Sequence, residues 1–247
     1  MSEHEECKLK KKWEVDVGTI FPGMFPGPLS FSCVGKSIDK FWNINSHDLR
    51  KYRIKKDLDD KPFGGGHGMI MRPDCMDSWL SEIYRGQKII YPSPRGRVFD
   101  QSMTSELLEN DLIILCGRYE GIDCRVLKHW NIEEVSIGDY ILCGGELAAM
   151  VMIESCVRTI EGVLGNSKSA LEDSFSDGLL ENDQYTKPAS WVPKNTDLEY
   201  NVPHVLRSGN HASISKWILE NKENLTENRR SDLWSKYVAR KEKNVHS

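Results

Sequence analysis

The sequence predicts an α/β protein with a mostly parallel sheet and helices on both of its faces. Residues 88–91 and 112–116 are short apolar runs of the kind that a parallel sheet buries. Residues 76–84 and 102–108 carry apolar side chains at spacings of three and four, which is typical of helices. Because helices and strands alternate along this part of the chain, we expect βαβ units in an open sheet.

Two further elements frame this core. Residues 13–21 alternate in polarity and contain Val and Ile, which predicts a first strand. Residues 146–160 form a long helical pattern that is apolar on most sides, so this helix is buried within the domain or against a second copy of the chain. We favour a subunit interface and therefore expect a homodimer.

Charge is distributed unevenly along the chain. The 247 residues have a charged fraction of 28% and a formal net charge of -4, which excludes a disordered chain and a uniformly basic coat. Residues 189–247 hold ten Lys and Arg against seven Asp and Glu, and the cations lie among Trp217, Trp234 and Tyr237. This mixture suits phosphates and exposed bases. A solvated helical face with Trp anchors explains it equally well.

The domain organisation follows from these patterns. Residues 161–183 contain six acids and one base without sustained periodicity, which indicates a flexible linker. We therefore predict an N-terminal extension (1–12), an α/β domain (13–160), a flexible interdomain linker (161–188) and a small helical C-terminal domain (189–247).

The cysteines and the apolar runs predict a cytoplasmic protein. The seven cysteines are odd in number and none forms a Cys-x-x-Cys pair, which suits reduced thiols in the cytosol. Residues 1–12 are polar and charged, so we expect neither a signal peptide nor a membrane anchor there. The longest clean apolar run, residues 147–153, is far too short to span a bilayer.

A run of glycines marks the first candidate site segment. Gly64, Gly65 and Gly66 precede His67 and Gly68 and permit a close approach of the backbone to a ligand. The spacing matches neither a phosphate loop nor the dinucleotide fingerprint. The segment Gly35-Lys36-Ser37 lacks the earlier glycine of a Walker motif, so we set an ATPase aside.

Three further glycine-bearing segments are candidates for a ligand crevice. Residues 91–96 contain two prolines and predict a stiff turn at the end of a strand. Residues 116–123 leave a buried strand with charged and aromatic groups between two glycines, and residues 136–146 enter the long helix. In an open α/β sheet such loops surround the ligand. Together they predict a site made mainly of backbone, which can bind an adenine edge and a ribose without a metal.

The same segments carry a resemblance to a known family. The chain contains Gly-Arg-Tyr-Glu-Gly-Ile-Asp, then Ser-Ile-Gly-Asp-Tyr-Ile-Leu-x-Gly-Gly-Glu, then Gly-Val-Leu-Gly and Glu-Asp-Ser-Phe. From about Trp13 to about Trp234 it resembles the TrmD family of bacterial tRNA (guanine-N1)-methyltransferases, which are SPOUT methyltransferases. The resemblance implies a C-terminal trefoil knot in the α/β domain, a feature that general folding rules argue against.

The resemblance also implies the methyl donor and the residues that hold it. The donor is S-adenosyl-L-methionine, and the residues expected to wrap it are Tyr91, Pro92, Ser93, Gly117, Tyr119, Glu120, Gly121, Ser136, Ile137, Gly138, Asp139, Tyr140, Ile141, Leu142, Gly144 and Gly145. Tight turns between strands explain any one of these segments, but they explain all three together poorly. Magnesium is possible for the family, but the sequence shows no dedicated carboxylate cage.

Two residues are expected to carry the reaction. Guanine N1 is a weak nucleophile until its proton leaves, so the enzyme needs a base, and Asp173 matches the proposed general base of the family. We expect a closed site to raise the pKa of this carboxyl by excluding water. Arg158 is expected to stabilise the negative charge that develops on guanine O6. The alternatives are a solvated linker acid for Asp173 and a helix C-terminal charge for Arg158.

The implied substrate is tRNA with a guanosine immediately 3′ of the anticodon, at position 37. The target base must leave its stack to be reached. We expect the substrate to contact the residues Gly64, Gly65, Gly66, Asp177, Ser208, Asn210 and His211, although His211 also suits a capping or packing role and Asp177 a solvated one. In the family a homodimer shares each site, so the base and the donor loops come from different chains.

Two residues depart from the family pattern, and two rival functions remain open. Arg95 stands where Gln is expected, and His67 stands where Pro or Ala is usual. The first rival is a methyltransferase with the same donor and another RNA base or ribose as target. The second is a module that binds RNA without chemistry, which needs neither Asp173 nor the donor loops.

Overall fold

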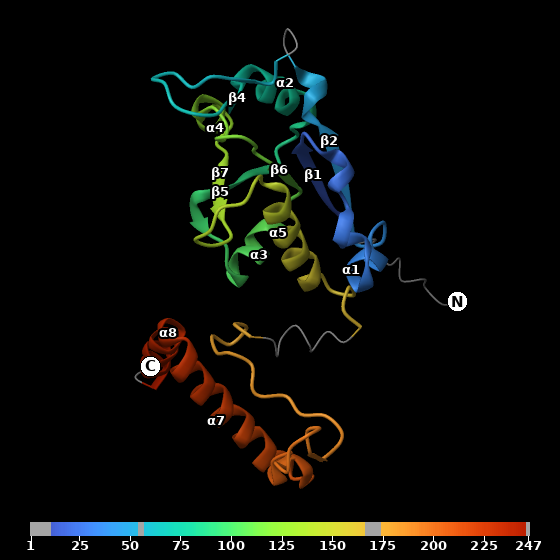
Figure 1. Cartoon of the computed structure of the whole chain (residues 1–247), viewed down its shortest axis with the longest axis vertical. Helices are drawn as coiled ribbons and strands as arrows, with labels where there is room; N and C mark the ends of the chain where they lie inside the picture. Colours follow the sequence, from blue (N-terminus) through green and yellow to red (C-terminus); the bar gives the residue numbers. More distant parts are fainter. Residues whose placement is uncertain (1–10, 54–56, 166–173, 246–247) are drawn as a thin grey trace, which may run out of the picture. The chain divides into compact units, whose positions relative to one another are not determined.

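The computed structural model describes residues 11–53, 57–165 and 174–245. It divides the chain into two units, residues 1–167 and 168–247. Figure 1 shows strands and helices in the first unit and mainly helices in the second. Each unit is described by itself.

A five-stranded parallel sheet forms the centre of the first unit. The strands lie in the order β2-β1-β6-β5-β7, and every neighbouring pair is parallel. The predicted α/β class with a mostly parallel sheet is therefore confirmed. The strands are β1 (Trp13–Thr19), β2 (Trp42–Asp48), β5 (Lys88–Val98), β6 (Leu112–Leu115) and β7 (Glu133–Ser136).

Helices cover both faces of the sheet because its central strands are apolar on both sides. In β6, Leu112 and Ile114 face one hydrophobic cluster, and Ile113 and Leu115 face the other. Side chains of α1, α3 and α5 complete the first cluster, and those of α2 and α4 complete the second. The helices are α1 (Ser32–Ser37), α2 (Pro73–Ile83), α3 (Gln101–Leu108), α4 (Cys124–His129) and α5 (Glu146–Thr159).

The segment 91–96 is not the turn that we predicted. It lies inside β5, which continues to Val98 and pairs with β7 on both sides of a register shift between Pro92 and Arg97. Proline lacks the N–H that a regular ladder needs, but its fixed φ is compatible with an extended chain at an irregular position. The prolines therefore interrupt the pairing without turning the chain.

A small antiparallel ribbon carries the run of glycines. β3 (Asp59–Asp60) pairs with β4 (Ile70–Met71), and the glycine run lies between them. Gly64, Gly65 and Gly66 have φ values of +86°, +81° and +129°, a region that side chains rarely adopt. Short 3-10 helices at Pro22–Met24, Gly27–Ser30 and Leu49–Tyr52 complete the first unit.

The second unit is built on two helices. α7 (His211–Arg229) packs against α8 (Ser231–Val245), where Glu223 accepts hydrogen bonds from the Tyr237 hydroxyl at 2.8 Å and the Lys241 ammonium at 2.9 Å. A 3-10 helix, His204–Arg207, precedes α7. A two-stranded hairpin of β8 (Ser190–Trp191) and β9 (Tyr200–Asn201) also belongs to this unit.

Part of the segment that we predicted as a flexible linker packs on α7. Leu179 is buried, the Leu180 amide donates to Thr226 Oγ1 at 2.9 Å, and the Asp183 amide donates to Asn221 Oδ1 at 2.7 Å. These bonds hold the later part of the predicted linker against the helical unit. The acidic side chains of this segment lie at the surface. A segment that packs on a helix in this way and a free chain can both lack periodicity, so the sequence pattern did not distinguish them.

Asp100 begins α3, and its removal is expected to destabilise the first unit. Its carboxylate accepts from the amides of Ser102 at 3.0 Å and Met103 at 3.1 Å, so it is the N-cap. We expect Asp100→Ala to lower the free energy of unfolding at pH 7 by about 0.5–2 kcal/mol in urea titrations. Asp100→Asn keeps an accepting oxygen, so it is the matched control with a smaller loss.

The pH dependence of this effect has a defined sign. The hydrogen bond that the Ser102 hydroxyl donates to Asp100 lowers the pKa of this carboxyl below the ordinary 3.8. The charge-dependent part of the stabilisation is therefore complete above pH 3.8 and is lost as the pH falls through the lower folded-state pKa. The difference in the free energy of unfolding between wild type and Asp100→Asn should become smaller as the pH falls below the folded-state pKa of Asp100. A gap that widened on acidification would contradict this assignment.

Candidate active site

Residues 91–94 in the middle of β5 and the loops that follow β6 and β7 together line a pocket of about 290 Å³. Loops that follow neighbouring parallel strands converge at one edge of the sheet, which explains the meeting of residues far apart in sequence. The lining residues are Tyr91, Pro92, Ser93, Pro94, Gly117, Arg118, Tyr119, Glu120, Gly121, Val135, Ser136, Ile137, Gly138, Tyr140, Ile141, Leu142, Cys143, Gly144, Gly145 and Ala148.

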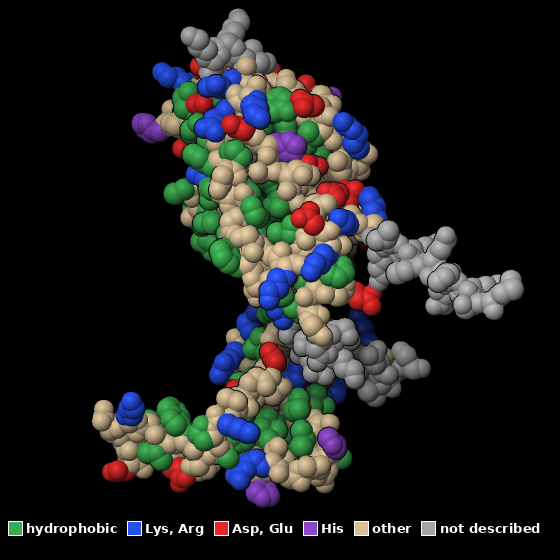
Figure 2. Space-filling model, turned by 90° about the vertical axis from the view of Figure 1, so that its right-hand side faces the viewer, with side chains coloured by type: hydrophobic (Ala, Val, Ile, Leu, Met, Phe, Trp, Pro, Cys, Tyr) green, Lys and Arg blue, Asp and Glu red, His purple; other side chains and the backbone are tan. Residues whose placement is uncertain are grey.

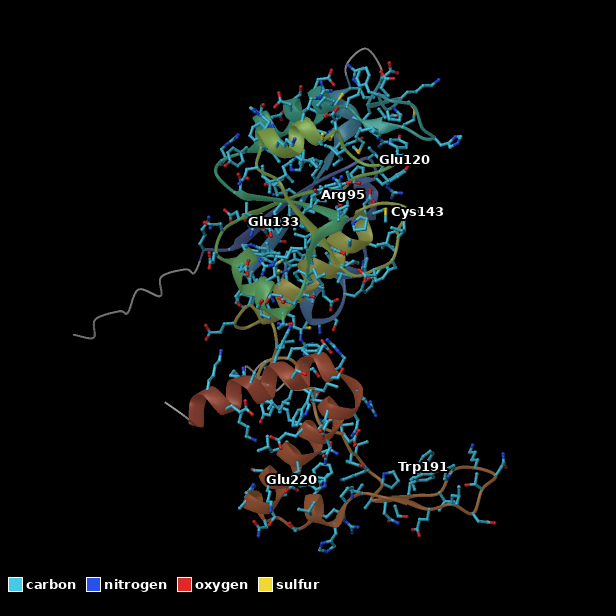
Figure 3. All side chains as sticks on the ribbon, turned by 90° about the vertical axis from the view of Figure 1, so that its left-hand side faces the viewer. Arg95, Glu120, Glu133, Cys143, Trp191 and Glu220 are labelled. Carbon is cyan, nitrogen blue, oxygen red and sulfur yellow. The ribbon has the colours of Figure 1, made fainter. Side chains whose placement is uncertain are left out.

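This lining contains every residue that we predicted to hold the donor except Asp139. It also contains residues that sequence reasoning did not single out: Pro94, Arg118, Val135, Cys143 and Ala148. Figure 3 labels Glu120 and Cys143 at this pocket and Arg95 beside it. Arg118 and Cys143 lie within the glycine motifs, so the signal that could have found them was their position between the predicted residues.

Glycines form much of the wall because the chain segments approach very closely. A Cβ atom on Gly117 would lie 2.6 Å from Cε2 of the Tyr91 ring. Gly121 has a φ of +121°, and a Cβ there would lie 3.1 Å from the Tyr91 hydroxyl oxygen. Backbone amides and carbonyls are therefore exposed to the cavity where side chains would otherwise stand.

An ion pair between a partly buried arginine of the lining and a buried glutamate lies at the start of α5. Arg118 contacts Glu146 through two nitrogens, Nε to Oε1 at 3.1 Å and Nη2 to Oε2 at 2.9 Å. The Thr19 hydroxyl at the end of β1 donates to the same carboxylate at 2.7 Å. Cys116, which precedes this loop, is fully buried, and burial raises the pKa of its thiol well above the ordinary value.

Arg95 lies at the rim of the pocket and is paired with β7. Its Nη2 donates to Glu134 Oε1 at 2.8 Å, and the Ser93 hydroxyl donates to the same oxygen at 2.9 Å. This hydrogen bond raises the pKa of the Arg95 guanidinium. Burial, and then the charge of Glu134, raise the pKa of the Tyr91 hydroxyl. Arg95, which stands where Gln is expected, therefore places a positive charge paired with Glu134 at the rim of the pocket.

One groove of about 550 Å³ adjoins the pocket, and a second of about 500 Å³ shares Pro62, Phe63 and Arg125 with the first. The larger one shares Tyr91, Ser93 and Glu120 with the pocket and includes Phe63, which is 99% exposed. The Glu120 amide donates to the Met69 carbonyl at 2.9 Å, so the ribbon is attached to the loop after β6. Gly64, Gly65 and Gly66 are not among the residues that line the pocket or the two grooves.

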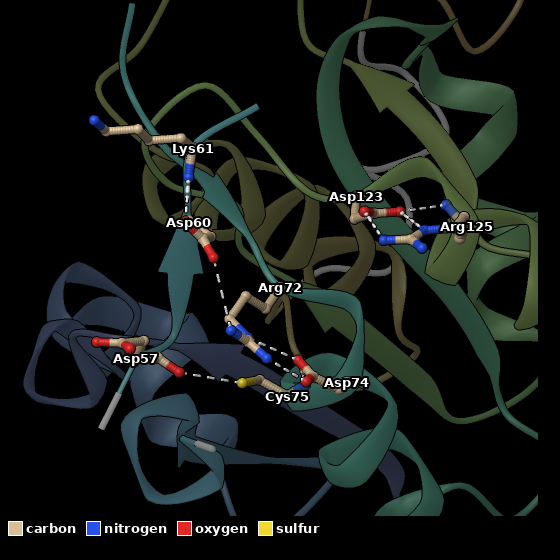
Figure 4. A network of polar contacts seen from close by, with 8 residues as sticks. All are labelled: Asp57, Asp60, Lys61, Arg72, Asp74, Cys75, Asp123 and Arg125. Carbon is tan, nitrogen blue, oxygen red and sulfur yellow. Dashed lines mark hydrogen bonds and ion pairs between the residues drawn. The ribbon is translucent and has the colours of Figure 1, made fainter. Parts of the chain in front are cut away.

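Arginines in these grooves are held by local carboxylates. Arg72 forms two hydrogen bonds with Asp74, at 3.1 and 2.6 Å, and Arg125 forms two with Asp123, at 3.0 and 2.7 Å (Figure 4). Their planar guanidinium groups are thereby fixed in orientation. His67, the second departure, is exposed near the glycines.

Of the two predicted catalytic residues, the structure describes only Arg158. Arg158 is in the last turn of α5 and is exposed. Asp173 lies outside the described residues. Nothing in the structure therefore relates these two groups to each other.

The predicted substrate residues of the second unit have local structural partners. Asp177 forms an ion pair with Lys222 and accepts from the Leu179 amide at 3.0 Å. Ser208 accepts from the Asn210 amide at 3.1 Å, and Asn210 caps α7 by accepting from the Ser213 amide at 3.1 Å. His211 is the exposed first residue of α7. These contacts shape the start of α7 and leave the histidine ring at the surface.

The described residues contain no group of three or more His, Cys, Asp or Glu side chains arranged to hold a metal ion. Among the same residues, every helix is too short or too polar to cross a membrane.

Comparison with known proteins identifies the family. A model of the tRNA (guanine-1)-methyltransferase TrmD family matches residues 13–236. The chain is 43% identical over 236 residues to a tRNA (guanine-N(1)-)-methyltransferase of Gluconobacter oxydans, covering 93% of this chain and 98% of the relative. It is 45% identical to the Roseobacter denitrificans enzyme of that name (92% and 95% covered). It is 47% identical to that of Anaplasma marginale strain St. Maries (88% and 93%). The chain belongs to the TrmD family of tRNA (guanine-N1)-methyltransferases.

Proposed function

We propose that this protein transfers a methyl group from S-adenosyl-L-methionine to N1 of the guanosine at position 37 of tRNA, immediately 3′ of the anticodon. The observation that carries the proposal is the pocket formed by residues 91–94 of β5 and the loops after β6 and β7, which are the segments that also carry the family motifs. A nonspecific RNA-binding module would not need such a pocket. The family match extends over both units of the chain.

The residues at the pocket suit this donor. Gly117, Gly121 and Gly138 expose backbone groups that can pair with an adenine edge and a ribose, and Ile137 and Leu142 supply apolar surface. When bound, the donor supplies an electrophilic methyl group on a sulfonium. Glu120 is the carboxylate of the lining and has the charge that suits a sulfonium. Asp139 lies next to the lining in sequence, and we retain it as a proposed donor residue.

The reaction itself is assigned to residues of this chain. Asp173 accepts the proton of guanine N1, and Arg158 stabilises the charge that develops on O6. Gly64, Gly65 and Gly66 approach the target base, and Asp177, Ser208, Asn210 and His211 contact the RNA. The basic residues of α7 and α8 hold the anticodon arm through its phosphates. Magnesium is not assigned a site.

We further propose a cytoplasmic homodimer that shares each site between two chains. Leu147 and Val151 are 52% and 46% exposed and lie one turn apart on α5, an apolar pair that suits a subunit contact. Ile141 is 80% exposed in the loop before this helix. Figure 2 shows hydrophobic side chains gathered on one face of the first unit.

The trefoil knot and the domain division are part of the same proposal. The Gly145 amide donates to the Gly117 carbonyl at 3.0 Å, and this supports a chain that returns from β7 past the loop after β6. We assign residues 13–160 to donor binding, 161–188 to the connection and 189–247 to RNA binding.

Methylation of tRNA transcripts with labelled donor tests the proposed function. A transcript with guanosine at position 37 is expected to take up label, and one with adenosine at that position is not. An N1-methyl group blocks base pairing, so primer extension on the product should stop at position 37. Equal label in both transcripts would defeat the specificity. Absence of donor binding in calorimetry would favour the RNA-binding module instead.

A further inference from the structure

The loop between β7 and α5 provides one wall of the pocket but has little packing of its own. Tyr140, Ile141 and Leu142 in this loop are 54%, 80% and 37% exposed. Their near contacts are local: the Tyr140 amide donates to the Gly138 carbonyl at 3.0 Å, and the Tyr140 hydroxyl donates to the Ile137 carbonyl at 3.1 Å. The position of this wall therefore depends on how its ends are attached.

The far end of the loop is fastened to Arg118. Nη1 of this guanidinium donates to the Cys143 carbonyl at 3.2 Å, while Nε and Nη2 contact the two carboxylate oxygens of Glu146. The carbon of the guanidinium also lies 4.5 Å from the centre of the Phe21 ring. One side chain thus joins the loop after β6, the loop before α5 and the segment after β1.

The close packing around Arg118 explains the glycines of the Gly-Gly-Glu motif. A Cβ on Gly144 would lie 2.3 Å from Nε of Arg118, and a Cβ on Gly145 would lie 3.1 Å from Cα of Cys116. The backbone of the loop therefore lies directly on the guanidinium. Cys143 and Gly144, which line the pocket, are therefore in direct contact with Arg118.

Stability alone is a poor reason for this arrangement. The Glu146 side chain is 1% exposed and the Arg118 side chain 19% exposed, so both charges are largely removed from water. Desolvation of such a pair offsets much of its attraction, and apolar residues of similar volume often give equal stability. The hydrogen bond from Nε to Oε1, the ion pair of Nη2 with Oε2 and the bond from Nη1 to the Cys143 carbonyl do fix the geometry of the guanidinium.

We propose that Arg118 and Glu146 are positioning residues for methyl-donor binding. They hold the wall formed by residues 140–144 in the conformation that accepts the donor, without themselves taking part in the chemistry. This inference rests on the proposed function, because the occupant of the pocket is the methyl donor. Thr19, at the end of β1, donates a hydrogen bond to the Glu146 carboxylate and so helps to orient it.

A double variant separates positioning from stability. R118M/E146Q removes both charges, so no unpaired charge is left buried, and we expect a thermal midpoint close to that of wild type. Its Kd for S-adenosyl-L-methionine in calorimetry should rise about tenfold, which corresponds to about 1.4 kcal/mol. The Michaelis constant for the donor should rise with it, while kcat at saturating donor and the Michaelis constant for tRNA stay close to wild type.

A matched control is available on the same unit. Arg97 forms a bidentate pair with Glu106 at 2.9 and 2.8 Å at the surface and does not line the pocket. R97M is expected to leave donor affinity unchanged. R118K keeps a charge beside Glu146 but cannot make all the bonds of the guanidinium, so its Kd should lie between wild type and the double variant. If the double variant does not fold, the donor Kd of R118K tests the proposal in its place.

Hydrogen exchange gives a readout of the loop itself. Amides of residues 140–144 should exchange faster in R118M/E146Q, and those of β6 should not change. A folded double variant that binds the donor as wild type does, or an R118K variant that does so where the double variant cannot fold, overturns the inference while the proposed function stands. A wild-type protein that takes up no donor overturns the proposed function, and this inference falls with it.

Discussion

Replacing Asp173 with asparagine is expected to lower kcat by about 10²–10⁴-fold, the range that a general base contributes. Asparagine has nearly the same shape but cannot accept the proton from guanine N1, so the loss should appear in turnover. Single-turnover methylation of a tRNA transcript measures the chemical step directly. Donor affinity in calorimetry should stay close to wild type, because Asp173 is not assigned to the donor pocket.

A second carboxylate of the connecting segment provides the control. Asp183 bonds to the Asn221 side chain at 3.2 Å and has no assigned role in the reaction. Asp183→Asn should therefore keep a kcat close to wild type. If the two variants lost the same amount of activity, the connecting segment would be acting through its charge or its folding, and Asp173 would not be the base.

Gly117→Ala is expected to weaken donor binding strongly. The added methyl group would lie 2.6 Å from the ring of Tyr91, which is only 8% exposed and has little room to move. Overpacking of this kind costs about 1–3 kcal/mol. If the ring or the loop moves into the pocket, this cost raises the donor Kd by about 5- to 150-fold. Calorimetry with S-adenosyl-L-methionine measures the change.

Gly23→Ala is the matched control for this variant. Gly23 is exposed, and no atom beyond its chain neighbours lies within 4 Å of an added Cβ, so the same substitution has room there. We expect its donor affinity to equal that of wild type. An unchanged affinity in Gly117→Ala, with the protein folded, would mean that the close approach to Tyr91 does not define the donor pocket.

The sequence predicts the central strands because burial makes them conspicuous. β6 and residues 89–92 of β5 are continuous buried apolar runs, and β1 alternates buried Trp and Val with half-buried Glu14 and Asp16. We did not predict β2 or β7. These strands occupy the two edges of the sheet and contain Asn, His, Asp and Glu side chains that reach the surface. Polar edge strands lack the pattern by which strands are recognised.

The position of the pocket was predictable from topology, whereas the side-chain contacts that hold its wall were not. Loops after parallel strands meet at one edge, so the grouping of the glycine-bearing loops after β6 and β7 follows from their order, and β5 lies between these two strands in the sheet. The partnership of Arg118 with Glu146 spans 28 residues, and that of Thr19 with Glu146 spans 127. Side-chain pairs at such separations depend on the packed structure. The prediction of a turn at residues 91–96 failed because proline also occurs at an irregularity within a strand.

The position of β6 in the middle of the sheet has a consequence for biosynthesis. The Glu14 amide bonds to Asp111, 97 residues later, and β1 pairs with β6 next to this point. While it is being made on the ribosome, β1 must therefore wait for most of the first unit before it can pair with β6. Pairings over such separations in a chain are slow to form, because a long loop must close first. The lining of the pocket extends to Ala148, so a nascent chain that ends before this residue lacks part of the pocket wall.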